Sequence, residues 1–195
     1  READRLGIEH RVITLRDDYK KNVLDYFRNA YRAGLTPNPC VMCNQKIKFG
    51  MLWERAIESG EHFDCFATGH YARVEFDAAS HRTLLKKGVD GFKDQSYFLY
   101  RLSQQQLKRV LLPLGQFNKT QIKDLAREVG FKDYADQKES QDFLECDDYG
   151  VLFEKNEFKP GNIVDVNGKI VGTHQGIIYY TVGQRKGLNI GAQPE

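Results

Sequence analysis

The run Phe63-Asp64-Cys65-Phe66-Ala67-Thr68-Gly69-His70 decides the expected fold of this chain. Its first six residues form a short, largely apolar segment, which is typical of a strand buried on both faces of a parallel sheet. In open α/β sheets, ligands gather at the carboxyl ends of such strands. Gly69 and His70 are therefore candidate site residues, although a histidine that only hydrogen-bonds to the backbone at a strand end would look the same.

Helical and β-type segments alternate around this run. Apolar residues at helical spacing, with glycines or capping residues at the ends, predict helices over residues 18–33, 44–59, 94–111 and 118–130. Short β-branched or aromatic runs predict strands at residues 10–15 and 63–68, and a hairpin of residues 71–76 with 83–87. This alternation predicts an α/β fold, a layered domain around a parallel sheet, over residues 1–150.

The pattern changes after residue 150. Residues 162–171 alternate apolar and polar side chains around Asn167-Gly168, which is a strong signal for a hairpin. Residues 177–182 predict a further strand. Because helical spacing is absent here, we expect a second, β-rich domain over residues 151–195 that is incomplete at Glu195.

Composition sets broad limits on function. The 195 residues are 41% hydrophobic and 29% charged, which is ordinary for a globular protein, and the net charge of +2 neither requires nor excludes nucleic acid. No apolar run reaches the ~18–20 residues that cross a bilayer. The 4 cysteines do not form a disulfide framework, so we expect a cytoplasmic protein. The chain starts without Met, and we expect both ends to lie inside a longer protein.

Cys40 and Cys43 are the side chains most able to carry chemistry. They follow a proline-rich turn and precede an expected helix start, where free backbone donors and the nearby Lys46 and Lys48 lower the pKa of a thiol. Such a thiol is a credible nucleophile. The alternatives are that the pair forms half of a zinc site or a redox dithiol. For an isolated pair of this spacing, the nucleophile, zinc and redox interpretations are equally supported.

Other segments offer weaker signals. Acidic neighbours on both sides should raise the pKa of Cys146, and Cys65 is expected to be inert packing inside its strand. Residues 93–97 combine charge, amide and aromatic groups that suit phosphate and base contacts, but a solvated helix cap looks alike. The two cations in residues 184–187 are equally compatible with RNA binding and with an ordinary solvent-exposed surface. The chain has no glycine-rich phosphate loop, so an ATP-gripping element would lie outside it.

Several runs stand in the order found in one family. They cover residues 34–44, 47–49, 67–73, 93–99 and 179–188. Together these runs resemble the bacterial tRNA-specific 2-thiouridylases. Any one of them could arise by chance, but all of them in order are very specific, and they extend over nearly the whole chain.

The resemblance implies an N-type ATP pyrophosphatase domain, which is adenine nucleotide alpha hydrolase-like, followed by the start of a small β-rich central domain that binds tRNA. It implies ATP-dependent 2-thiolation of the wobble uridine of tRNA, through adenylation and cysteine-mediated sulfur transfer. ATP with Mg is the implied cofactor, and tRNA and a persulfide-donating sulfur carrier protein are the implied partners, without a membrane. The piece alone is expected to be inactive, because the family's phosphate loop lies outside it.

Site residues follow by position from the resemblance. Cys43 and Cys146 are the implied catalytic cysteines, and Gly69 is the implied ATP contact. The implied contacts to tRNA or its target base are Asn38, Pro39, Cys40, His70, Lys93, Asp94 and Gln95.

Two departures from the family leave the partner of Cys43 open. The family's second cysteine corresponds to Leu144, two places before Cys146, and many members carry Asp where this chain has Cys40. A disulfide of Cys43 with Cys146 or Cys40 is one reading. The other is that the three cysteines hold an iron–sulfur cluster. The alternative function is a non-catalytic metal-binding, iron–sulfur or RNA-binding fragment.

Overall fold

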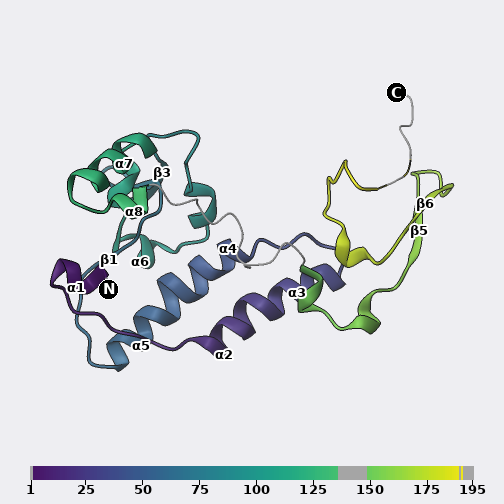
Figure 1. Ribbon diagram of the computed structural model, residues 1–195, viewed down its shortest axis with the longest axis horizontal. Helices are drawn as coiled ribbons and strands as arrows, with labels where there is room; N and C mark the ends of the chain where they lie inside the picture. The colour runs from purple at the N-terminus through teal and green to yellow at the C-terminus, as the bar shows by residue number, and fades with distance from the viewer. Residues whose placement is uncertain (1, 136–148, 189, 191–195) are drawn as a thin grey trace. The chain divides into compact units, whose positions relative to one another are not determined.

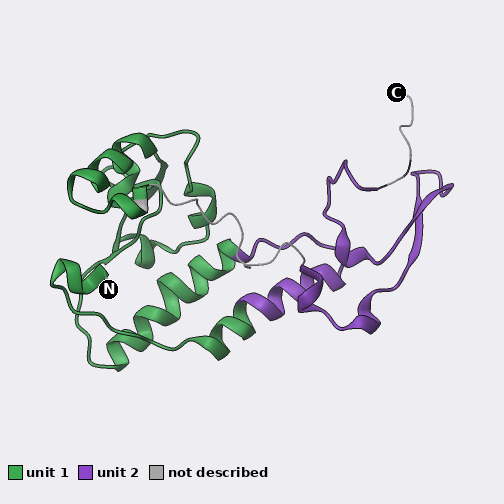
Figure 2. Cartoon of the chain, in the orientation of Figure 1, with its two compact units in different colours: residues 1–22, 40–139 green, residues 23–39, 140–195 purple. Residues whose placement is uncertain are grey.

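A computed structural model describes residues 2–135, 149–188 and 190 of the chain. These residues form two compact units, Arg1–Asn22 with Cys40–Glu139, and Val23–Pro39 with Ser140–Glu195 (Figure 2). The first is called unit 1 and the second unit 2. The domain boundary expected near residue 150 stays a prediction.

Two long helical stretches dominate the N-terminal half (Figure 1). The first runs through α2 (Arg16–Tyr19), the π-helical η1 (Lys20–Leu24) and α3 (Asp25–Arg32). The second runs through α4 (Pro39–Met42), the π-helical η2 (Cys43–Met51) and α5 (Leu52–Glu58). Both match predicted helices, but the second starts at Pro39 rather than near Asn44, because proline is well tolerated in a first turn.

The described residues form three two-stranded sheets. β1 (Phe66–Ala67) and β4 (Val110–Leu111) pair in parallel. β2 (Ala72–Asp77) and β3 (Arg82–Lys87) form one antiparallel hairpin, and β5 (Gly161–Val164) and β6 (Ile170–His174) form another. Both predicted hairpins are therefore confirmed.

The remaining elements are short. They are α1 (Glu2–Leu6), η3 (Ser96–Leu99), α6 (Gln104–Leu107), η4 (Pro113–Gln116), α7 (Lys119–Glu128), α8 (Lys132–Ala135), η5 (Tyr149–Leu152), η6 (Lys155–Glu157) and η7 (Ile177–Tyr179). The helix predicted over residues 118–130 is confirmed, because Asn118 and Gln121 form a capping box at the start of α7. Throughout the described residues, no helix is both long and apolar enough to cross a bilayer.

Three predicted elements are wrong. Residues 10–15 form no strand, because no neighbouring described strand pairs with them. The helix predicted over residues 94–111 is η3, α6 and β4 instead, since Ser103 starts a new capping box and Val110 pairs with Phe66. The strand predicted over residues 177–182 begins with the 3₁₀ turn η7 after Gly176, whose φ of 144° breaks an extended path.

The predicted burial of the first parallel strand is also wrong. Phe66 is half-buried, while Ala67 and Cys65 are exposed. Side chains alternate between the two faces of a strand, so only the face that carries Phe66 reaches the core. Cys65 is therefore not the inert packing residue that the sequence suggested.

The core of unit 1 forms where the second helix packs on the sheets. Phe49 and Trp53 lie in one buried cluster with residues of the strands and the loops between them, namely Ala72, Leu99, Leu102, Leu107, Val110 and Leu112. Gly115 lies so close to β2 that a Cβ atom there would stand 1.7 Å from the Ala72 carbonyl oxygen. The close approach of these segments therefore requires glycine at this position.

Unit 2 has a separate aromatic core. Phe27 and Tyr31 of α3 pack edge to face at 4.9 Å, and both lie against Phe153 and Ile178. The Arg28 guanidinium donates a hydrogen bond of 2.6 Å to the Leu152 carbonyl. This cluster ties the helix of unit 2 to the segments after residue 149.

Candidate functional site

Cys40 and Cys43 lie on consecutive turns of the second helix, and both are half-buried. Residues three apart on a helix are neighbours on one face. Burial raises the pKa of Tyr19, and the negative charge that either cysteine would carry as a thiolate acts in the same direction. The two cysteines share a partly dry environment.

The predicted lowering of the thiol pKa at Cys43 is wrong. Burial raises the pKa of Cys43, Lys48 acts in the opposite direction, and Cys40 adds to the rise. The reason is the early helix start at Pro39, which places Cys43 beyond the first residues whose N–H groups lack helical partners. The resting group is a protonated thiol at neutral pH, so its thiolate needs a cation such as Lys48.

A second group of candidates lies at the carboxyl end of β1. A cavity of about 460 Å³ is lined by Lys48, Leu52, Phe66, Thr68, Gly69, His70 and Gln95. Burial and then the charge of Lys48 lower the pKa of His70 to about 4. His70 is therefore neutral at pH 7. Its Nδ1 lies 2.8 Å from the Thr68 hydroxyl, which leaves Nε2 as the other polar atom of the ring.

Gln95 is held firmly at the edge of this cavity. Its N–H donates to the Tyr71 carbonyl at 2.8 Å, and its Oε1 accepts from the Tyr71 N–H at 3.0 Å. The side-chain NH₂ group of Gln95 is left to donate to a ligand. This arrangement suits the RNA contact that was expected of Gln95.

Asp94 has internal partners. Its carboxylate accepts from the Gly88 N–H at 2.8 Å and from the Ser96 hydroxyl at 2.8 Å. Burial alone would raise the pKa of Asp94, but these hydrogen bonds outweigh it and the pKa is lowered. Asp94 thus organises the loop that carries Lys93 and Gln95. A contact of Lys93 or Asp94 with tRNA stays a prediction.

Packing does not require glycine at position 69. A Cβ atom there would meet only the Leu114 side chain, at an ordinary 3.6 Å. A ligand that approaches the backbone at this point would supply a different reason for glycine, and the ATP contact expected of Gly69 would be such a case.

The candidate residues thus fall into distinct places. Lys48 lines the same cavity as His70, and its charge acts on the pKa of both His70 and Cys43. Asn38 donates its N–H to the Tyr26 hydroxyl at 3.4 Å, and Pro39 opens α4. Cys146 lies outside the described residues, and its pairing with Cys43 stays a prediction.

The iron–sulfur alternative depends on the same undescribed cysteine. Across the part of the chain that the structure describes, no three His, Cys, Asp or Glu side chains are grouped to hold a metal. Cys40 and Cys43 supply two thiols, and the third proposed ligand is Cys146. We therefore derive no chemical step through a cluster.

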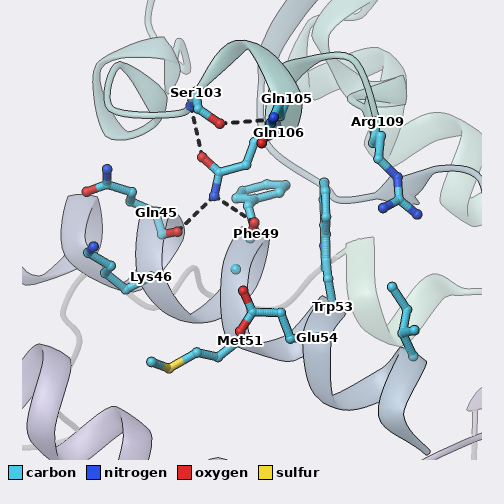
Figure 3. A pocket seen from close by; sticks show the side chains of 12 residues that line it. Gln45, Lys46, Phe49, Met51, Trp53, Glu54, Ser103, Gln105, Gln106 and Arg109 are labelled. Carbon is cyan, nitrogen blue, oxygen red and sulfur yellow. Dashed lines mark hydrogen bonds between the residues drawn. The ribbon is translucent and has the colours of Figure 1, made fainter.

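Lys48 was not selected from the sequence as a site residue, and it lies in the π-helical η2, which is bonded to Gln106. The Gln106 side-chain amide donates to the carbonyls of Gln45 and Phe49, at 3.0 and 2.7 Å (Figure 3). Its Oε1 accepts from the Ser103 N–H at 2.8 Å. The amide group supports two carbonyls of the π-helical segment, and π-helical turns are often found at functional sites.

Comparisons with known proteins agree with these features. Residues 1–146 match the family described as tRNA methyl transferase HUP domain, and residues 150–195 match tRNA methyl transferase PRC-barrel domain. The chain is 48% identical over 193 residues to tRNA-specific 2-thiouridylase MnmA 2 of Thermoanaerobacter sp. (strain X514), covering 96% of this chain and 52% of that protein.

Two further relatives carry the same description. The chain is 46% identical over 192 residues to tRNA-specific 2-thiouridylase MnmA of Syntrophomonas wolfei, covering 97% of this chain and 56% of the relative. It is 47% identical over 195 residues to that of Carboxydothermus hydrogenoformans, covering 97% and 53%. The chain spans about half the length of the curated relatives it matches.

Proposed function

Because the chain belongs to the tRNA methyl transferase family defined by the HUP and PRC-barrel domains, we propose that the whole protein is a tRNA-uridine 2-sulfurtransferase. Relatives described as tRNA-specific 2-thiouridylases support the proposal. The structural observation that supports it is that Lys48 and His70 line one cavity, while the charge of Lys48 also lowers the pKa of Cys43 against the effect of burial. The same family matches confirm the predicted α/β fold class, with a HUP domain followed by a PRC-barrel domain.

The cavity at the carboxyl end of β1 fits a nucleotide. Its lining offers the ammonium of Lys48, the amide of Gln95 and the open backbone at Gly69. ATP with Mg, when bound, would supply the adenylyl group that makes the C2 oxygen of the wobble uridine a leaving group. Lys48 would balance phosphate charge, and neutral His70 would offer Nε2 for a hydrogen bond without competing as a cation.

The sulfur step uses the thiol chemistry of Cys43. A persulfide on a second cysteine, Cys146 or Cys40, attacks C2, and AMP leaves with the former uridine oxygen. The Cys43 thiolate then attacks the Sγ of that second cysteine. The bond between this Sγ and the sulfur on C2 breaks, and 2-thiouridine is released. Cys43 and the second cysteine end as a disulfide, and an external dithiol must reduce it before the next turnover.

The contribution of this chain is to make the Cys43 thiolate available when it is needed. Burial keeps the thiol protonated at rest, which protects it from oxidation. Lys48 stabilises the thiolate once the proton has gone to solvent. A persulfide-donating carrier protein would recharge the second cysteine, and tRNA would be the acceptor.

Thiolation by the full-length protein tests the proposal. The assay measures 2-thiouridine in tRNA after incubation with ATP, Mg and a persulfide donor. Cys43→Ser should remove at least about 99% of the activity, because serine cannot form the disulfide that releases the product. Cys65→Ser is the matched control and should retain activity, since Cys65 is an exposed residue just before β1. Full activity of Cys43→Ser would contradict the proposed role.

A further inference from the structure

Two exposed tyrosines form one aromatic surface on unit 1. Tyr97 is 65% exposed and Tyr100 is 61% exposed. Their ring centroids lie 5.7 Å apart, with an angle of 32° between the ring planes. Two neighbouring exposed rings present a contiguous apolar area that can bind a partner.

The local backbone explains why the two rings lie together. Tyr97 lies in the 3₁₀ helix η3, and Tyr100 caps its end. Side chains three residues apart eclipse one another in 3₁₀ geometry. Leu99, on the other side of the turn, is 1% exposed and anchors it in the core. The pair is therefore a fixed surface rather than two independent side chains.

This surface is attached to the residues on both sides of Cys43. The Asn44 side-chain amide, which is 3% exposed, donates to the Phe98 carbonyl at 3.1 Å. The Arg101 guanidinium donates to the Met42 sulfur at 3.3 Å. The tyrosine pair thus has a defined position relative to the cysteine, and Arg101 adds a cation beside it.

The chemistry of the surface identifies its ligand. Exposed aromatic faces with a neighbouring guanidinium are what proteins use to stack unpaired RNA bases. Gln95, at the edge of the cavity, immediately precedes the turn that carries Tyr97. The tyrosine pair therefore follows closely, along the chain, on a residue that lines the candidate cavity.

We propose that Tyr97 and Tyr100 stack on an unpaired tRNA base beside the target uridine, and so position the anticodon loop over Cys43. This inference rests on the proposed function. It gives Tyr97, which lies in the run 93–97 already expected to suit base contacts, a stacking role, and it adds Tyr100 as its partner. An unpaired base is the ligand, because bases in a duplex already stack on each other and expose no face.

Binding of two RNAs to the full-length protein tests the inference. One is a synthetic anticodon stem-loop, and the other is a duplex of equal length without unpaired bases. The double variant Tyr97→Ala, Tyr100→Ala should lose at least about fivefold in stem-loop affinity, the lower end for one base–aromatic stack, and little in duplex affinity. Tyr97→Phe with Tyr100→Phe should restore the affinity, because the rings remain.

Controls separate stacking from general damage. Phe76→Ala removes a ring of similar exposure, 59%, from the hairpin and should leave both affinities unchanged. The melting temperature of the alanine variant should match that of the wild type, since neither tyrosine is buried. Unchanged stem-loop affinity in the alanine variant, or an equal loss for both RNAs, would overturn the inference. Absence of thiolation by a wild-type protein that still binds the stem-loop through the tyrosines would count against the proposed function alone.

Discussion

Lys48 lies five residues after Cys43 within the π-helical η2, and its charge lowers the thiol pKa of Cys43 against the effect of burial. In an α-helix, residues five apart point to different sides, whereas the wider turn of a π-helix, with its i→i+5 bonding, brings them closer to one side. The same ammonium lowers the pKa of His70. One lysine therefore influences the pKa of two candidate site residues, in each case as a smaller cause than burial.

Lys48→Met should slow the reaction of Cys43 with iodoacetamide by about two- to tenfold at neutral pH, because the thiolate loses its stabilising cation. Mass spectrometry of the peptide that contains Cys43 separates this rate from that of the other cysteines. Lys46→Met is the matched control, an exposed lysine of the same segment that does not act on Cys43, and it should leave the rate unchanged. Equal effects of the two variants would contradict the role of Lys48.

The sequence predicts the helix that carries Cys43 but not its π-helical geometry. Periodicity of apolar residues is read at α-helical spacing, and at that spacing Cys43 and Lys48 do not share a face. Gln106, which is distant in sequence, bonds to the carbonyls of Gln45 and Phe49 within this segment. Such a tertiary contact leaves no local signal around Cys43.

Hairpins and caps were predicted well because their causes are local. The Asn167-Gly168 turn and the Asn118 capping box each depend on a few adjacent residues. The prediction of a strand at residues 10–15 was wrong because a strand depends on a distant contact: it needs a hydrogen-bonding neighbour elsewhere in the chain. The predicted lowering of the Cys43 pKa was wrong for a similar reason, because burial, which raises this pKa, is a property of the folded core.

Gln106→Leu should lower the free energy of unfolding by about 2 to 4 kcal/mol, since it leaves two partly buried carbonyls with fewer hydrogen-bond donors and breaks a capping box. Urea denaturation measures this change. The neighbouring Gln105→Leu is the control and should change stability by less than about 0.5 kcal/mol, because Gln105 is exposed. Amide exchange within η2 should also speed up in Gln106→Leu alone, and unaltered exchange there would refute the support given by Gln106.

His70 should make the protein less stable as the pH falls. Its pKa is about 4 in the folded protein and 6.5 ordinarily, so the unfolded chain takes up the proton first. The stabilising contribution is fully present above about pH 6.5 and is lost down to about pH 4, amounting to at most about 3 kcal/mol.

Urea denaturation between pH 4 and 7.5 checks the His70 prediction. His70→Gln should flatten the pH dependence across that window, because the variant has no imidazole to protonate. His62→Gln is the control, since His62 is exposed, and it should keep the wild-type slope. An unchanged slope in His70→Gln would show that another group causes the pH dependence.

Gly69→Ala and Gly115→Ala form a matched pair that separates a ligand requirement from a packing requirement. Alanine at position 115 would place Cβ 1.7 Å from the Ala72 carbonyl oxygen, so the backbone must shift and stability should fall by more than about 3 kcal/mol. Alanine at position 69 would make one ordinary 3.6 Å contact with Leu114, so stability should change by less than about 1 kcal/mol.

The same pair tests whether a nucleotide approaches the backbone at Gly69. If ATP lies against this residue in the full-length protein, the added methyl group of Gly69→Ala should weaken ATP binding at least about tenfold while the melting temperature stays near the wild-type value. Isothermal titration with ATP and Mg measures the affinity. Wild-type affinity in a normally folded Gly69→Ala protein would place the nucleotide elsewhere, because the fold itself gives no reason for glycine at this position.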